Sequence, residues 1–174
     1  MSNLFELLGP LIPKHFDKNE FYVIGILLLV WGLFFVFHRW ERILSKTEII
    51  SILVFNQLFA TVGDRLLAEP PLDFYDTLDY AHGEFFDSIL QVAVYPVPIL
   101  IFIHFYYKYK PRKIFFLILC AVILSFLEWV SVTFFNLYQY KEWNTVYSFI
   151  FYLFAMTVNL YFSYLINKLE TIND

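Results

Sequence analysis

Long apolar runs separated by short polar loops are the dominant pattern in this 174-residue chain. Five runs each approach the roughly 20 residues that a helix needs to cross about 30 Å of hydrocarbon. Their apolar residues show no strict alternation, so the pattern favours helices over the strands of a membrane barrel. The predicted spans are residues 21–37, 47–67, 85–107, 114–135 and 146–166.

The first run carries its basic cluster on its C-terminal side and has no small-residue cleavage site, so we expect it to stay in the chain as a helix. Before it, Met1 to Phe16 is short and interrupted by Gly9, Pro10 and Pro13, and its leucines fall on roughly one face. That pattern is typical of a helix lying in the membrane interface. The fold class is therefore an all-α integral membrane protein: one domain, residues 1–174, forming a five-transmembrane-helix bundle with a short N-terminal interfacial helix. In the third span we expect a kink, because Pro96 and Pro98 cannot donate backbone hydrogen bonds.

Loop charge predicts the orientation. Lys and Arg gather after the first and third spans and in the C-terminal tail, whereas the second loop contains acids and neither basic residue. By the positive-inside rule the N-terminus lies outside and the C-terminus is cytoplasmic, which places the protein in a cell membrane. Aromatic residues near the loop ends are expected to form two interfacial belts. The outer belt would contain Tyr75, Tyr80, Tyr138, Tyr140 and Trp143, and the inner belt Tyr106, Tyr107 and Tyr109.

Composition agrees with the pattern. The chain is 60% hydrophobic and only 16% charged, which excludes an ordinary soluble domain. Its net charge of -4 offers no basic surface for nucleic acid. Membrane lipids are the expected partners, with homo- or hetero-oligomers through helix packing as a further option. With the single Cys120, no disulfide can form within one chain.

Polar side chains inside the spans indicate where chemistry resides. An ionised carboxylate within a bilayer costs several kcal/mol unless it is paired, protonated or in contact with water, so Asp64 and Glu128 stand out. Helical spacing puts Gln57 and Thr61 on the face of Asp64, and polar stripes also mark the third and fourth spans. We therefore predict an outward-facing polar pocket. Its candidate binding residues are Asp64, Arg65, Glu84, Asp87, Gln91 and Glu128.

Arg65 leaves the charge of that pocket open. It is adjacent to Asp64 and so points about 100° away from it, and it has the choice of Glu69 at i+4 or Glu128 on another helix. The polar stripes also have a purely structural interpretation as interhelical hydrogen bonds. For Asn56, Gln57, Asn159 and Ser163 this interpretation is favoured.

No cofactor or metal site is predicted. His82 near Glu84 lacks the ligand set of a zinc site, and the acids of the second loop lack calcium-loop spacing. Three functions remain: a pocket that binds or transports a cation, proton or small polar solute; a structural or partner-binding subunit; and a membrane-embedded enzyme in which Glu128 is the general acid or base for a lipid-like substrate.

A short series of motifs gives the chain a resemblance. It consists of Gly63-Asp64-Arg65-Leu66, Tyr95-Pro96, Glu128, and then Tyr140, Trp143-Asn144 and Tyr147-Ser148. In order and spacing these motifs resemble an uncharacterised family of small multi-pass membrane proteins from Bacillus, Clostridium and related Firmicutes. The resemblance covers roughly the last two thirds of the chain, with Arg65 where an apolar residue is more usual. It implies a bacterial inner-membrane protein of about five helices and singles out Asp64 and Glu128, without implying a reaction.

Overall fold

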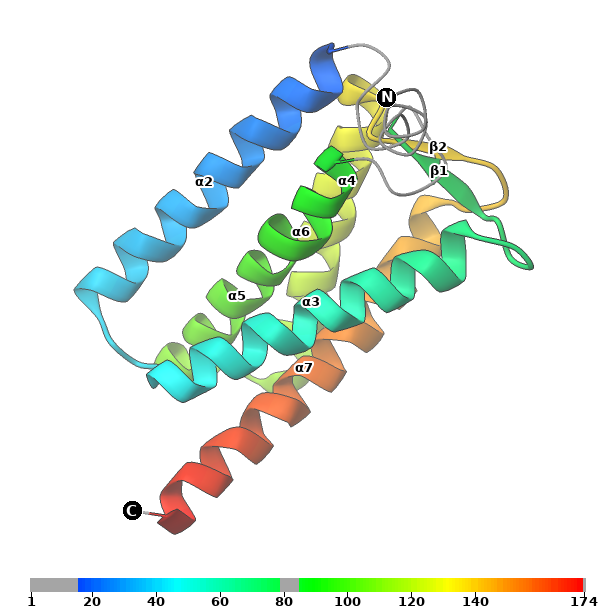
Figure 1. The fold of residues 1–174 in the computed structure, drawn as a ribbon. Coiled ribbons are helices and arrows are strands. Elements are labelled where there is room, and N and C mark those ends of the chain that lie inside the picture. Colours follow the sequence, from blue (N-terminus) through cyan, green and yellow to red (C-terminus); the bar gives the residue numbers. More distant parts are fainter. Residues whose placement is uncertain (1–15, 79–84, 174) are drawn as a thin grey trace, which may run out of the picture.

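The computed structural model describes residues 16–78 and 85–173, and within them five helices are long and apolar enough to cross a membrane (Figure 1). All five predicted helical runs are confirmed. The predicted interfacial helix, Met1 to Phe16, lies outside the described ranges except for its last residue. The helices are α2 (Lys18–Trp40), α3 (Lys46–Ala68), a composite third helix formed by α4 (Phe85–Ile89), η2 (Leu90–Val94) and α5 (Pro96–Tyr109), α6 (Lys113–Phe135) and α7 (Thr145–Asn173).

Local sequence explains where the helices begin and end. Asp17 and Ser45 cap α2 and α3 with their side chains, and Glu20 and Glu48 complete a capping box at each start. At its C-terminal end α6 stops at Asn136, which adopts the left-handed conformation that asparagine tolerates well. The long final helix continues beyond the apolar run that predicted it.

The third helix is irregular where the prolines predicted a kink. Five residues, Leu90–Val94, form a π turn that Tyr95 separates from Pro96, and the Tyr95 amide donates to the Leu90 carbonyl at 2.9 Å. Prolines remove donors from this stretch, so some of its carbonyls need partners outside the helix. The Trp31 indole of α2 supplies one, donating to the Ala93 carbonyl at 2.8 Å. A π turn of this kind is common near functional sites.

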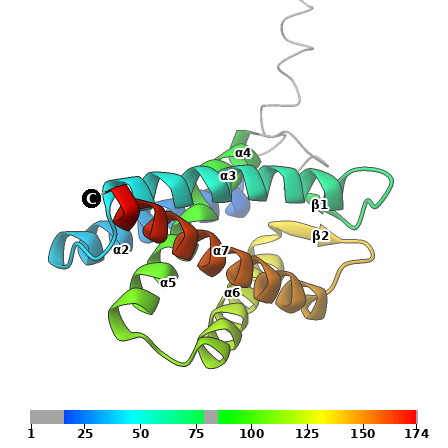
Figure 2. The same cartoon turned by 90° about the horizontal axis from the view of Figure 1, so that it is seen from below.

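A short antiparallel sheet joins the two loops at one end of the bundle. Strand β1 (Tyr75–Thr77) pairs with β2 (Tyr138–Tyr140), with Tyr75 opposite Tyr140. Figures 1 and 2 place it beside the C-terminal end of α3 and the N-terminal end of α7. Lys141 follows β2 and ion-pairs with Asp73 and Asp76, at 2.7 and 2.9 Å. Strand pairing and these ion pairs therefore join the two loops, and the joined loops cover this end of the helices.

Interhelical hydrogen bonds hold the centre of the bundle. The buried Asn56 amide on α3 donates to the Asn159 side chain on α7 at 2.7 Å. Nearer the C-terminal end of α7, the Ser163 hydroxyl donates to the Tyr107 hydroxyl of α5 at 3.1 Å. The predicted role of Asn56, Asn159 and Ser163 as interhelical hydrogen-bond residues is confirmed. Around them the core is apolar, and many large apolar side chains on the outer helix faces are exposed.

Candidate functional site

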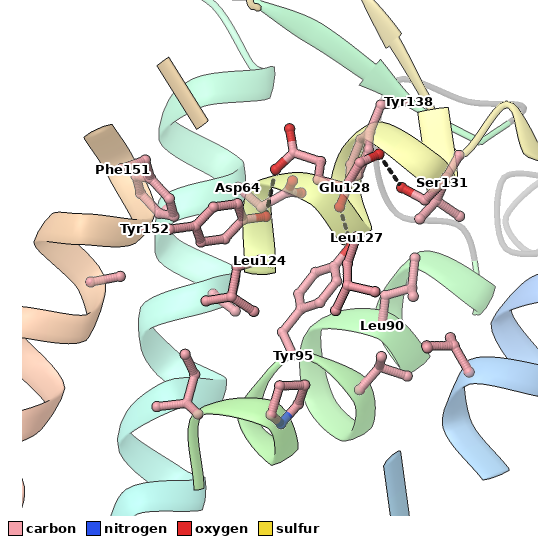
Figure 3. A pocket seen from close by; sticks show the side chains of 18 of the residues that line it. Asp64, Leu90, Tyr95, Leu124, Leu127, Glu128, Ser131, Tyr138, Phe151 and Tyr152 are labelled. Atoms are coloured by element: carbon pink, nitrogen blue, oxygen red, sulfur yellow. Dashed lines mark hydrogen bonds between the residues drawn. The ribbon is translucent and has the colours of Figure 1, made fainter. Parts of the chain in front are cut away.

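A cavity of about 190 Å³ lies between the helices at the end covered by the sheet (Figure 3). Its lining comes from α2, α3, the third helix, α6, α7 and both strands. Asp64 on α3 and Glu128 on α6 both line it. The two carboxylates singled out by the sequence therefore share one hollow, as the predicted pocket requires.

Glu128 is surrounded by hydroxyl groups. The Tyr152 hydroxyl of α7 donates to one carboxylate oxygen at 2.5 Å, and the Ser148 hydroxyl, also of α7, donates to the other at 2.5 Å. The Tyr140 hydroxyl of β2 donates to that second oxygen as well. The Trp143 indole donates to the Ser148 hydroxyl at 2.8 Å and orients it. Each of the three hydroxyls can donate to a carboxylate oxygen, so together they can satisfy an ionised carboxylate.

Asp64 has a separate set of donors. The Tyr75 hydroxyl of β1 donates to one of its oxygens at 2.9 Å, and the Gln91 amide of η2 donates to the other at 2.9 Å. The same Gln91 nitrogen donates to the buried Asp87 carboxylate at 3.0 Å. Gln91 thus joins two acids through one amide group, and Asp87 forms a second layer behind the cavity wall.

Aromatic rings make up much of the remaining lining. Tyr95 of the third helix and Tyr138 of β2 share a hydrogen bond between their hydroxyls, and Tyr75 stacks edge-on against Tyr138 with ring centroids 5.4 Å apart. Burial raises the pKa of the Tyr75 phenol, and the Asp64 carboxylate adds to that increase. Burial, followed by the nearby Glu128, likewise raises the pKa of the Tyr140 phenol. Both phenols therefore remain protonated donors well into the alkaline range.

This inward arrangement corrects the expected outer aromatic belt. Four of its five residues line the cavity, because the sheet folds back over the helix ends and their polar groups find partners there. These residues are Tyr75, Tyr138, Tyr140 and Trp143. The fifth, Tyr80, lies outside the described residues.

The other predicted site residues divide into three groups. Gln91 and Asp87 do not line the cavity but are joined to Asp64 by the hydrogen bonds described above. Arg65 was predicted among the pocket residues, but it does not line the cavity: of its two expected partners it pairs with Glu69, at 3.0 Å, and its side chain is 75% exposed. The i+4 spacing provides that partner on the outer face of α3, so the alternative pairing with Glu128 does not occur. Glu84 lies outside the described residues.

Sequence reasoning missed the hydroxyl donors, above all Tyr140, Ser148 and Tyr152. Tyr140 and Ser148 belong to motifs of the resemblance, but nothing in the spacing assigns them to Glu128. Thr61, expected on the face of Asp64, is exposed instead, and that face of α3 presents Ala60 and Gly63 to the cavity.

The chemistry of the site follows from its charges. Two carboxylates line the cavity, and its described lining contains no Lys, Arg or His. Such a hollow attracts positive charge, and its aromatic faces also favour cations. Comparison of the chain with protein-family models, with curated proteins and with solved structures found no match.

Proposed function

We propose that this protein is a multi-pass membrane protein whose outward-facing cavity binds a cation, as a receptor site or as a step in transport. The observation that supports the proposal most is that Asp64 and Glu128 share one cavity whose described lining has no basic side chain. Carboxylates in a membrane-embedded hollow mark ion or solute sites more often than accidental burial. Of the ligands compatible with the sequence, a cation complements these charges best.

Membrane placement belongs to the same proposal. The connections α2–α3 and α5–α6 and the C-terminus lie toward one end of the bundle (Figure 1), and most Lys and Arg residues occur there. The positive-inside rule makes that end cytoplasmic, which leaves the sheet and the cavity on the outer side. The resemblance of the sequence supports a bacterial inner membrane as the location within this proposal.

The third helix is the proposed moving element if binding leads to transport. Its π turn and prolines interrupt the regular helical hydrogen bonds around Gln91 and Tyr95. Gln91 is hydrogen-bonded to Asp64, and Tyr95 to Tyr138. Interrupted helices at ion sites are a recurring device of transporters. A change at η2 would alter the cavity and the sheet together.

Cation binding is tested on the full chain reconstituted in lipid nanodiscs. Potassium, sodium and tetramethylammonium chlorides are titrated at equal ionic strength. The readouts are the unfolding temperature and the intrinsic tryptophan fluorescence, to which Trp143 contributes from the cavity lining. At least one of these cations should bind saturably, and Glu128→Gln should weaken it by at least tenfold, equivalent to about 1.4 kcal/mol. Asp64→Asn provides a second variant should Glu128→Gln fold poorly.

Glu142→Gln is the matched control, because Glu142 is an exposed acid just after β2 that does not line the cavity. It removes the same charge near the same end of the bundle and should leave the affinity unchanged. The proposal fails if the wild-type protein binds none of the three cations saturably, or if the control loses as much affinity as Glu128→Gln.

One observation favours a second candidate, a purely structural role. Three hydroxyls from β2 and α7 already donate hydrogen bonds to the Glu128 carboxylate. These bonds also connect α6 to α7 and to the sheet, as interhelical hydrogen bonds do in membrane proteins. In that case Glu128→Gln lowers the free energy of unfolding and no cation titration distinguishes it from wild type.

A further inference from the structure

The lining of the cavity is better suited to an organic cation than to a bare metal ion. An inorganic ion stripped of water needs several oxygen ligands converging on one point. No group of three or more His, Cys, Asp or Glu side chains with that geometry occurs among residues 16–78 and 85–173. The rings of Tyr95, Tyr138 and Trp143 line the hollow instead, and aromatic faces with nearby carboxylates are the usual surroundings of an alkylated ammonium group.

The volume of the cavity agrees with a small organic group. A protein cavity of about 150 Å³ holds a molecule the size of benzene. At about 190 Å³, the hollow between Asp64 and Glu128 accommodates a headgroup with several methyl groups.

An apolar groove on the outside of the bundle adjoins the cavity. It lies along α3 and α7, and four residues line both hollows: Phe59, Gly63, Leu67 and Phe151. At Gly63, which lines both hollows, an added Cβ would meet the tip of the Phe151 ring at 3.8 Å. Figure 3 shows Phe151 and Tyr152 of α7 at the side of the cavity toward α3.

The groove itself is built for a chain rather than for a headgroup. Its remaining residues are apolar and mostly exposed, and they are Phe55, Leu58, Val62, Leu66 and Phe154. Leu58 and Leu66 are eight residues apart on α3, which corresponds to about 12 Å along the helix axis at the usual rise per residue. A medium-length alkyl chain fits that distance.

We propose that the site binds a cationic amphiphile, with its alkylammonium head in the cavity and its alkyl chain in the groove between α3 and α7. This inference rests on the proposed cation site and adds the class of ligand and a lateral route from the bilayer. Charge complementarity determines the class: a zwitterionic or anionic lipid would bring its phosphate toward two carboxylates, with no Lys, Arg or His in the described lining to receive it.

A photoreactive probe locates the chain directly. The probe is a decyltrimethylammonium salt with a diazirine at the end of its chain, added to the full protein in nanodiscs, and labelled residues are identified by mass spectrometry. Labelling should concentrate on residues 55–67 and 151–154. Excess tetramethylammonium or the Glu128→Gln change should reduce that labelling at least tenfold, equivalent to about 1.4 kcal/mol. Excess lysophosphatidylcholine should not reduce it.

Leu58→Asn tests the groove without touching the cation cavity, because Leu58 lines the groove and not the cavity. A polar side chain there should reduce groove labelling, while tetramethylammonium binding stays within twofold of wild type. Leu28→Asn on α2 is the matched control, because Leu28 is also an exposed leucine and lines neither the groove nor the cavity. It should leave both measurements unchanged.

The outcomes separate this inference from the proposed function. If tetramethylammonium binds and depends on Glu128, but the probe labels all lipid-facing helices evenly, the cation site stands and the amphiphile proposal is overturned. Competition by lysophosphatidylcholine, or equal loss of groove labelling in Leu58→Asn and Leu28→Asn, also overturns it. If tetramethylammonium does not bind at all, the cation site itself is refuted.

Discussion

Replacing Tyr152 with phenylalanine removes one hydroxyl donor from Glu128 and keeps the ring in place. The bond it removes is 2.5 Å long and joins α7 to α6. A hydrogen bond to a charged group contributes about 1.5–3 kcal/mol, whereas one between neutral groups contributes about 0.5–1.5 kcal/mol. We therefore expect Tyr152→Phe to lower the free energy of unfolding by about 1.5–3 kcal/mol.

A double-mutant cycle isolates the part of that loss that depends on the charge. In a Glu128→Gln background the acceptor is neutral, so removing the Tyr152 hydroxyl should cost only about 0.5–1.5 kcal/mol. The difference between the two backgrounds gives a coupling energy of about 1–2 kcal/mol. Unfolding in mixed micelles with a rising fraction of sodium dodecyl sulfate, followed by circular dichroism, measures all four proteins under the same conditions.

Tyr161→Phe on the same helix is the control. The Tyr161 side chain is 60% exposed, so its hydroxyl should contribute less than about 0.5 kcal/mol. A Tyr152→Phe loss as small as that of Tyr161→Phe, or a coupling energy near zero, would refute the description of Glu128 as a charged acceptor bound to Tyr152.

Three further predictions follow from the same contacts. The phenols of Tyr75 and Tyr140 have raised pKa values in the folded protein, so their stabilising contribution is present below the ordinary tyrosine pKa of about 10 and is lost as the pH rises beyond it; the unfolding temperature should fall in that range, and less steeply in Tyr140→Phe. Lys141→Gln removes the ion pairs with Asp73, just before β1, and with Asp76, within β1. It should lower the unfolding temperature slightly at low salt and leave it unchanged at high salt. Asn159→Ala removes the partner of Asn56 between α3 and α7 and should cost about 0.6–2 kcal/mol in the same micelle titration, and no loss would contradict the structural role assigned to that pair.

The helices were predictable because length and hydropathy alone define them. A run such as 114–135 contains few polar residues, and a helix is the structure in which a single run satisfies its own backbone groups in an apolar environment. The sequence predicted a kink at the place of the π turn but not the π turn itself. Pro96 and Pro98 show which hydrogen-bond donors are missing, but not how the preceding turn accommodates the loss.

The site was predictable in its acids and not in their partners. Asp64 and Glu128 stand out because a bilayer penalises them, which requires no knowledge of the fold. Their donors come from four other elements, and pairings so distant along the chain leave no local pattern. The sheet was missed for a related reason: two three-residue strands are too short for an alternating pattern, so Tyr75 and Tyr140 resembled residues of an interfacial belt.

The donors of the two carboxylates determine how a cation can bind. Each hydrogen bond to an ionised acid contributes about 1.5–3 kcal/mol, and three of them for Glu128 offset a burial cost of several kcal/mol. In the proposed site a cation would therefore add to a network that the chain already satisfies, and would not have to complete one. Its binding energy comes from the net negative charge of the hollow and from the aromatic faces, both of which favour a large, weakly hydrated cation. Tetramethylammonium should consequently bind more tightly than sodium or potassium, and an affinity order led by sodium would mean that the hydroxyls turn away from the carboxylates to coordinate the ion.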